Sequence, residues 1–176
     1  LFAVLALAAH GATFLVWKTD GLVQQRSRRL ATRLWWVVAA VLLPVTWATA
    51  RVNTDVFAQF STRPLAWLLA ASWIAGLMAT PWFLRRRQEW PAFASSSLFL
   101  LGLLAATAAC VFPVMLRSQL DRAHHLTAFN ASAPEHSLTM GLWWWGLGVP
   151  LAIAYSAVLM RIHRGKVSFQ AGEGGY

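Results

Sequence analysis

The sequence has few charged residues, and very few of these are acidic. Only 12% of its 176 residues are charged, about half of the roughly 25% found in soluble domains. The six Asp and Glu residues all lie outside the long apolar runs. A proton pump or ion-coupled transporter needs acidic groups at membrane depth. We therefore do not expect a self-sufficient ion pathway within this chain.

Several sequence signals of catalysis are also missing. The single cysteine, Cys110, cannot form an internal disulfide, and there is no CxxC pair to bind a metal. There is no glycine-rich phosphate loop, nucleophile elbow or HExxH helix. The sequence by itself therefore predicts no catalytic residue.

The apolar residues occur in long runs instead of the stripes of a soluble core. Hydrophobic residues make up 58% of the chain, and five runs approach or reach the roughly 20 helical residues that span a bilayer. The predicted spans are 1–17, 34–50, 65–84, 97–116 and 141–160. We predict an all-α integral membrane bundle of five transmembrane helices, forming one domain over 1–176. Because the first run begins at Leu1 without a methionine, we expect a part of a longer protein.

The cations predict the topology of these spans. The net charge of +9 comes mainly from the first and third connectors and the tail, so the positive-inside rule places these segments in the cytoplasm. The C-terminus is then cytoplasmic. No RNA- or DNA-binding motif accompanies the charge, and we expect no nucleic-acid partner. The cations concerned are Lys18, Arg26, Arg28, Arg29, Arg33, Arg85, Arg86, Arg87, Arg161, Arg164 and Lys166.

Small residues, prolines and tryptophans predict how the helices pack. Two stripes at four-residue spacing predict close helix contacts: Ala71, Ala75 and Ala79, and Gly102, Ala106 and Cys110. Three prolines are expected to kink their helices: Pro44, Pro113 and Pro150. The tryptophans near span ends predict an interfacial belt. The triple Trp143–Trp145 could alternatively flank a planar cofactor.

His10 is the one histidine inside a predicted span, seven residues before Trp17. An imidazole in hydrocarbon is costly and marks a functional site or a packed polar contact. His10 could ligate haem or hydrogen-bond a quinone. Because no second histidine in a span is present to pair with it, we favour a structural hydrogen bond to a neighbouring helix, with Thr13 close by. We also hypothesise that Lys18 and Asp20 cap the end of this helix.

The connector after the fourth span contains the other cluster of possible ligands. A metal site there is conceivable, since Asp121 and His125 would be one helical turn apart. Loop histidines beside acids are more often solvated, so we predict no metal. The residues concerned are Asp121, His124, His125, Glu135 and His136.

Taken together, the chain resembles the C-terminal half of the subunit II family of cytochrome bd, the bacterial quinol-oxidising terminal oxidase. The first matching stretch runs from His10-Gly11-Ala12 to Lys18-Thr19-Asp20-Gly21 and Arg26–Arg29. The second comprises Phe112-Pro113, Leu126-Thr127, Asn130-Ala131-Ser132 and Ser137-Leu138-Thr139-Met140. The third comprises Pro150, Tyr155, Arg164-Gly165-Lys166-Val167 and the closing Gly175-Tyr176.

The resemblance implies a non-haem structural subunit in the bacterial inner membrane. In that family, haem b and haem d belong to the partner, subunit I, and the heterodimeric complex oxidises quinol and reduces dioxygen to water. Subunit II can hold a structural quinone, and a small single-helix accessory subunit and membrane lipid are further expected partners. No catalytic residue is carried over to this chain. The alternative from another class is a stand-alone multi-pass transporter.

Overall fold

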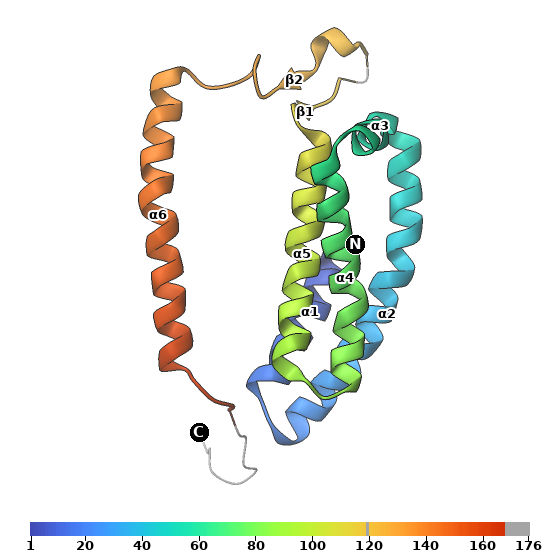
Figure 1. The fold of residues 1–176 in the computed structure, drawn as a ribbon, viewed down its shortest axis with the longest axis vertical. Helices are drawn as coiled ribbons and strands as arrows, with labels where there is room; N and C mark the ends of the chain where they lie inside the picture. The colour runs from blue at the N-terminus through green and yellow to red at the C-terminus, as the bar shows by residue number, and fades with distance from the viewer. Residues whose placement is uncertain (119, 168–176) are drawn as a thin grey trace. The chain divides into compact units, whose positions relative to one another are not determined.

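The computed structural model describes residues 1–118 and 120–167. Glu173 and the Gly175-Tyr176 close lie outside the described residues. The chain divides into two compact units, one formed by 1–111 with 166–167 and the other by 112–165. Long α-helices dominate both units (Figure 1), which confirms the all-α prediction. The prediction of a single domain stays a prediction.

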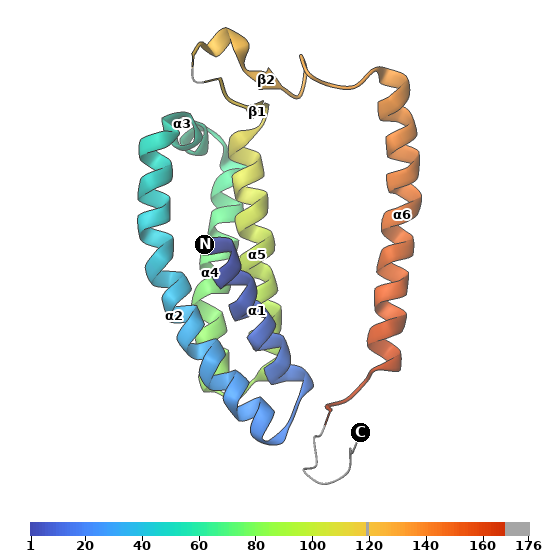
Figure 2. The ribbon, with the colours of Figure 1, turned by 180° about the vertical axis from the view of Figure 1, so that it is seen from behind.

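The first unit consists of two helical hairpins and a short linking helix. Helix α1 (Phe2–Lys18) packs against α2 (Gly21–Val52), and α4 (Pro64–Arg85) packs against α5 (Glu89–Val111). Helix α3 (Thr54–Thr62) links the hairpins at one end. Figure 2 shows the same bundle from behind, where α1 also lies along α5. The connections between successive helices from α1 to α5 are short.

Among residues 1–118 and 120–167, four helices are long and apolar enough to cross a membrane, namely α2, α4, α5 and α6 (Glu135–Ile162), and α1 is a shorter apolar helix. The chain is thus a multi-pass membrane protein. Helix α2 contains the whole of the second predicted span, 34–50, and extends beyond it to Gly21. Residues 21–33 are rich in Arg and Gln. These residues are too polar for a hydropathy pattern to mark them as part of a membrane span, but they are good helix formers.

The tight turn between α1 and α2 depends on Gly21. Its φ of 62° is a backbone conformation that favours glycine, and only Thr19 and Asp20 separate the two helices. Asp20 occupies the N-cap position of α2, although its side chain makes no capping hydrogen bond. The basic segment that was predicted to be a loop is therefore a helical extension of α2.

The fourth predicted span was displaced along the chain. Helix α5 begins at Glu89, before the predicted 97, and ends at Val111. Because Phe112-Pro113 follows the helix, Pro113 does not kink it, and the prediction of a kink there was wrong. Pro44 and Pro150 do lie inside helices, in α2 and α6.

Small residues bring α4 and α5 into close contact. A Cβ at Gly76 would lie 2.6 Å from the backbone nitrogen of Phe99, and one at Gly102 would lie 2.5 Å from Ser72 Oγ. The predicted stripe on α5 is buried, as Gly102, Ala106 and Cys110 show. The predicted stripe on α4 was wrong, because Ala71 and Ala75 are exposed. Helix α4 instead buries Ala66, Ala70, Gly76, Thr80 and Leu84.

The core of the first unit lies between α1, α2, α4 and α5. Its largest fully buried side chains are Trp35 and Phe99. Their rings meet edge to face, with centroids 5.3 Å apart and planes at 85°. This geometry is favourable for aromatic pairs. Opposite them, α1 contributes Ala9 and Val16, which are also fully buried.

The second unit contains a small hairpin and the last helix. Strand β1 (Val114–Leu116) pairs antiparallel with β2 (Leu126–Thr127), and the short 3₁₀ helix η1 (Arg122–His124) lies between them. Helix α6 follows and buries none of its residues. Trp143–Trp145 are accordingly exposed, and the interfacial belt stays a prediction.

Candidate functional site

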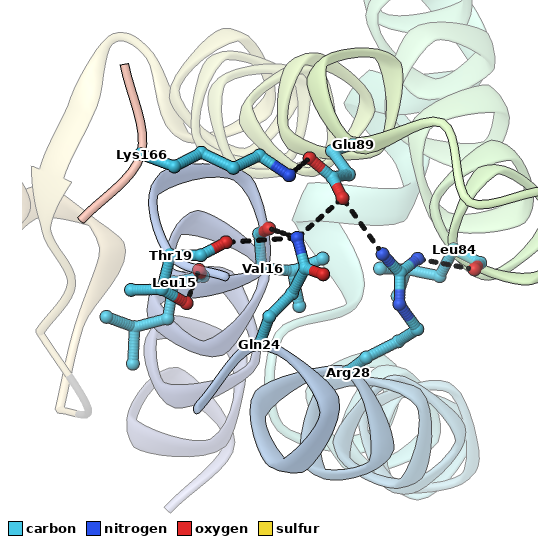
Figure 3. A network of polar contacts seen from close by, with 8 residues as sticks. All are labelled: Leu15, Val16, Thr19, Gln24, Arg28, Leu84, Glu89 and Lys166. Atoms are coloured by element: carbon cyan, nitrogen blue, oxygen red, sulfur yellow. Dashed lines mark hydrogen bonds and ion pairs between the residues drawn. The ribbon is translucent and has the colours of Figure 1, made fainter. Parts of the chain in front are cut away.

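The main polar site of the first unit lies where the α1–α2 turn meets the α4–α5 turn. We call this the basic end, because it carries Lys18, Arg26, Arg28, Arg29, Arg33 and Arg85–Arg87. At its centre is the carboxylate of Glu89, the first residue of α5. Figure 3 shows Gln24 and Arg28 of α2, and Lys166 from the segment after α6, directed toward this carboxylate.

Glu89 accepts a short hydrogen bond or an ion pair from each of these side chains. Gln24 Nε2 donates to Oε1 at 2.6 Å, and Arg28 Nη2 lies 3.1 Å from the same oxygen. Lys166 Nζ lies 2.6 Å from Oε2. An acidic residue at the first position of a helix also interacts favourably with the helix dipole. Two cations, one amide and the first turn of α5 thus converge on the Glu89 carboxylate.

Gln24 closes the C-terminal end of α1. Besides Glu89, its amide nitrogen contacts the carbonyl oxygens of Val16 and Thr19 at 3.1 and 3.0 Å. All three partners are acceptors, so the nitrogen must face them, and its two hydrogens are shared among them. Thr19 adds a hydrogen bond from its hydroxyl to the carbonyl of Leu15 at 2.7 Å.

These contacts differ from the hypothesised Lys18–Asp20 cap. The hydrogen bonds that cap α1 come from Thr19 and Gln24, while the ammonium of Lys18 lies 4.4 Å from the ring centroid of Trp17. The free carbonyls of the last helical turn need donors, which threonine and glutamine provide. These capping hydrogen bonds come from neutral side chains, and a contribution from Lys18 and Asp20 stays a hypothesis.

Arg28 connects α2 to both helices of the other hairpin. Its Nη1 donates to the carbonyl oxygen of Leu84 at 3.0 Å, in the last turn of α4, while Nη2 binds Glu89. The side chain is 21% exposed and that of Glu89 is 19% exposed. Screening by water is therefore weaker here than at a fully exposed ion pair.

The segment after α6 also joins this site. The backbone N–H of Val167 donates to the carbonyl of Lys18 at 2.8 Å, and Thr19 and Val167 form an isolated parallel bridge. Together with the Lys166–Glu89 ion pair, these contacts attach residues 166–167 to the α1–α2 turn. The site thus joins segments from both ends of the sequence. Its chemistry is that of a structural clamp, since the carboxylate already accepts several donors.

A second polar cluster lies inside the bundle, around the predicted residue His10. Its Nδ1 lies 2.8 Å from the hydroxyl oxygen of Ser96 on α5, and its ring stacks on Phe93 with centroids 5.1 Å apart. Thr13 lies on another face of α1, where its hydroxyl accepts a hydrogen bond from Trp35 Nε1 at 3.0 Å and donates to Ala9 O. His10 and Thr13 therefore contact different helices.

The conceivable metal site in the connector after the fourth predicted span does not assemble among the described residues. Within residues 1–118 and 120–167, no three His, Cys, Asp or Glu side chains come close enough to hold a metal ion. The segment from Asp121 to His125 contains the short 3₁₀ helix η1, and its side chains make other contacts. His125 Nδ1 instead accepts a hydrogen bond from the backbone N–H of Ser118 at 3.1 Å, and Asn130 Nδ2 donates to the carbonyl of His125.

Sequence reasoning missed Glu89 and Gln24. Glu89 was grouped with the acids outside the spans, and Gln24 lies in the connector between the first two predicted spans. Their contact joins residues 65 positions apart, which no local pattern reveals. One signal was present, because an acid two residues after Arg87 is suited to begin a helix and to pair with nearby cations.

Comparisons with known proteins identify relatives of this chain. A family model described as cytochrome bd terminal oxidase subunit II matches residues 1–163. The chain is also similar to the cytochrome bd ubiquinol oxidase subunit 2 of Bacillus subtilis (strain 168), with 28% identity over 131 residues. This match covers 73% of the chain and 37% of that relative. The chain therefore spans well under half the length of the relative.

Proposed function

The chain belongs to the cytochrome bd terminal oxidase subunit II family, and from this membership we propose that it is part of the non-haem subunit of a quinol oxidase. In this proposal it supports a haem-bearing subunit I, which oxidises quinol and reduces dioxygen to water. The observation that carries the proposal is the family match over 1–163, which includes every helix of the structure. The match does not favour a stand-alone transporter.

The contribution of these residues is a tightly packed helical support. Gly76 and Gly102 let α4 and α5 approach at backbone distance, and small residues are what such contacts require in lipid. The interior polar groups bond to one another, as in the Trp35–Thr13 and His10–Ser96 contacts. A support of this kind holds its shape and keeps water and lipid away from a neighbouring subunit.

The side chains of this chain do not fit a haem site. Haem iron in proteins is held by axial donors such as His, Met or Cys. His10 is the one histidine of α1–α5, and its ring is packed between Ser96 and Phe93. Cys110 is buried at the α4–α5 side of α5. We therefore assign haem b and haem d to the proposed subunit I and derive no step through them here.

The proposal includes an orientation in the bacterial inner membrane. The basic end carries most of the cations of the first unit, whereas the opposite end, around α3, carries Arg51 and Arg63. The positive-inside rule then places the basic end, and with it Lys166, in the cytoplasm. Reactivity of single introduced cysteines toward an impermeant thiol reagent, applied to intact cells, would test this orientation.

The test of the oxidase role is a reduced-minus-oxidised visible spectrum of the full-length protein purified from its native membrane. We expect a d-type haem band in a fraction that also contains a second large subunit. Membranes from cells that lack this protein provide the control, and there we expect the haem-bearing subunit to be depleted. A haem-free preparation that stays intact and alone would refute the proposal.

A further inference from the structure

One exposed stripe of α2 changes from cationic to apolar along its length. Residues spaced alternately three and four apart lie on one face of a helix. Near the basic end this stripe is made of arginines, and farther along it is made of aromatic and aliphatic side chains. Each of its members is exposed: Arg26, Arg29, Arg33, Trp36, Ala40, Leu43 and Trp47.

Helix α4 carries a matching stripe that meets the first. From the basic end inward it reads Arg85, Trp82, Met78 and Ile74, and all four residues are exposed. The two stripes join where the Arg85 guanidinium carbon lies 5.6 Å from the ring centroid of Trp36. The hydrogen bond from Arg28 to the carbonyl of Leu84 holds the same two helices together just beside this point.

Tryptophan rings hold two of these guanidinium groups in place. Besides the Arg85–Trp36 pair, the Arg86 carbon lies 4.1 Å from the ring centroid of Trp82. Stacking on an aromatic face restrains a guanidinium but leaves its N–H donors free at the edge. The donors of both groups therefore remain available to an anion.

These arginines have no carboxylate partner in the part of the chain that the structure describes. The ion pairs at the basic end use Arg28 and Lys166, and both bind Glu89. Arg29, Arg33 and Arg85 belong to no ion pair among residues 1–118 and 120–167. The positive charge of this face is thus uncompensated by the described residues.

The position along the helix matches the lipid headgroup layer. Arg33 lies about 4.5 Å beyond Trp36 along the axis, at 1.5 Å per residue. The headgroup layer is roughly 5–7 Å deep on each side of the hydrocarbon core, and tryptophan prefers its inner boundary. Arg33 and Arg85 therefore lie at phosphate depth when Trp36 lies at that boundary.

We propose that this face, which we call the arginine–tryptophan face (Arg29, Arg33, Trp36, Trp82, Arg85 and Arg86), binds an anionic glycerophospholipid. Arg33 and Arg85 hold the phosphate, because the planar guanidinium matches phosphate oxygens bidentately. The acyl chains lie along the apolar continuation of the stripes, over Leu43 and Met78. Zwitterionic lipids bind less tightly, since their ammonium group is repelled by the same cations.

The test is a lipid titration of the full-length protein, purified with the subunits that accompany it, stripped of lipid and followed by native mass spectrometry. The probes are phosphatidylglycerol, phosphatidylcholine with the same chains, and inorganic phosphate. In the double variant R33Q/R85Q we expect phosphatidylglycerol to bind about 30-fold more weakly, at roughly a 5-fold loss per basic residue removed near an anionic headgroup. A matched control, R51Q/R63Q, removes two cations at the opposite end of the first unit and should bind nearly as the wild type does.

Several outcomes would overturn the proposal. Equal weakening in the control would show that diffuse surface charge attracts the lipid. If phosphatidylcholine binds as tightly as phosphatidylglycerol, the acyl chains and not the phosphate determine binding. If inorganic phosphate displaces phosphatidylglycerol at concentrations similar to that of the lipid, the face is a site for free anions. If the glutamine pair fails to fold, R33K/R85K tests the same contacts with the charge kept. Weakening by lysine supports the bidentate contact, whereas wild-type affinity contradicts it.

Discussion

Replacing Glu89 with glutamine would measure how strongly the polar network holds the basic end together. Glutamine has nearly the same shape but no charge, and an NH2 group replaces one acceptor oxygen. The ion pairs with Arg28 and Lys166 are lost, and one donor is left facing another donor. Because the shape is conserved, packing contributes little to the expected effect.

The size of the effect follows from the exposure of the partners. A hydrogen bond to a charged group contributes about 1.5–3 kcal/mol, whereas an exposed ion pair contributes only about 0–1 kcal/mol. Arg28 is 21% exposed and lies nearer the first case, while Lys166 is 39% exposed and lies nearer the second. We therefore expect the local opening of the basic end to become easier by about 2 kcal/mol, most of it from the Arg28 contact.

Amide hydrogen exchange of the full-length protein in detergent is the appropriate assay, because it reports local opening. Exchange at the first turn of α5 and at the α1–α2 turn should become about 30-fold faster, the factor that corresponds to about 2 kcal/mol. The matched control is Glu135→Gln. Glu135 is likewise the first residue of a helix but is exposed, so its loss removes only a helix-dipole contribution below about 1 kcal/mol.

Comparison of the two variants decides the question. If Glu89→Gln and Glu135→Gln accelerate local exchange equally, the contacts around Glu89 contribute nothing beyond the helix dipole. If the acceleration spreads evenly over α1–α5, the network stabilises the whole bundle and not its end. Either result would refute the reasoning from local exposure.

Three further substitutions test the interior of the bundle. Gly76→Ala should destabilise the protein by about 1–3 kcal/mol, because the new Cβ would meet the backbone of α5. Gly11 has open space around it, so Gly11→Ala should leave the stability unchanged. Thermal unfolding of both variants in detergent makes the comparison. Trp35→Phe should lower the free energy of unfolding by about 1 kcal/mol, because the hydrogen bond to Thr13 is lost. In a double-mutant cycle, adding Thr13→Val to Trp35→Phe should cause no further loss of stability. If the losses of the two single variants add, the hydrogen bond does not contribute. His10→Ala should lower the yield of the assembled complex more than turnover per haem, and normal yield with lost turnover would contradict a structural role.

The apolar spans could be predicted from the sequence, but the polar extensions of the helices could not. Hydropathy reports which residues tolerate lipid, so it found the centres of α2 and α5. It did not detect that α2 extends outward to Gly21 or that α5 begins at Glu89. Those turns are helical because of propensity and tertiary contacts, which a hydropathy pattern does not include.

The rotation of a helix was equally hard to predict. On α4, small residues occur on more than one face, since Ala71 and Ala75 are as small as Ala66 and Ala70. Only the position of the neighbouring helix decides which face is buried, and here it is the face of Gly76. The stripe on α5 was unambiguous by comparison, and it is buried as predicted.

The site at the basic end lay beyond prediction for a related reason. Glu89 contacts Gln24 and Arg28, which are 65 and 61 positions away, and each residue type is ordinary for a membrane-protein connector. His10 was conspicuous because it lies within an apolar run, and sequence reasoning therefore found it. Its partner Ser96 could not be identified without the pairing of α1 with α5.

The three partners of Glu89 differ in the order in which they are synthesised. Gln24 and Arg28 precede Glu89 in the chain, so both can pair with the carboxylate as soon as the ribosome has delivered α5 to the membrane. Lys166 follows only after β1, β2 and α6 have been translated, several seconds later at roughly 5–20 residues per second. The carboxylate therefore has two partners before α6 is made, and the lysine contact forms last, when that helix has been inserted.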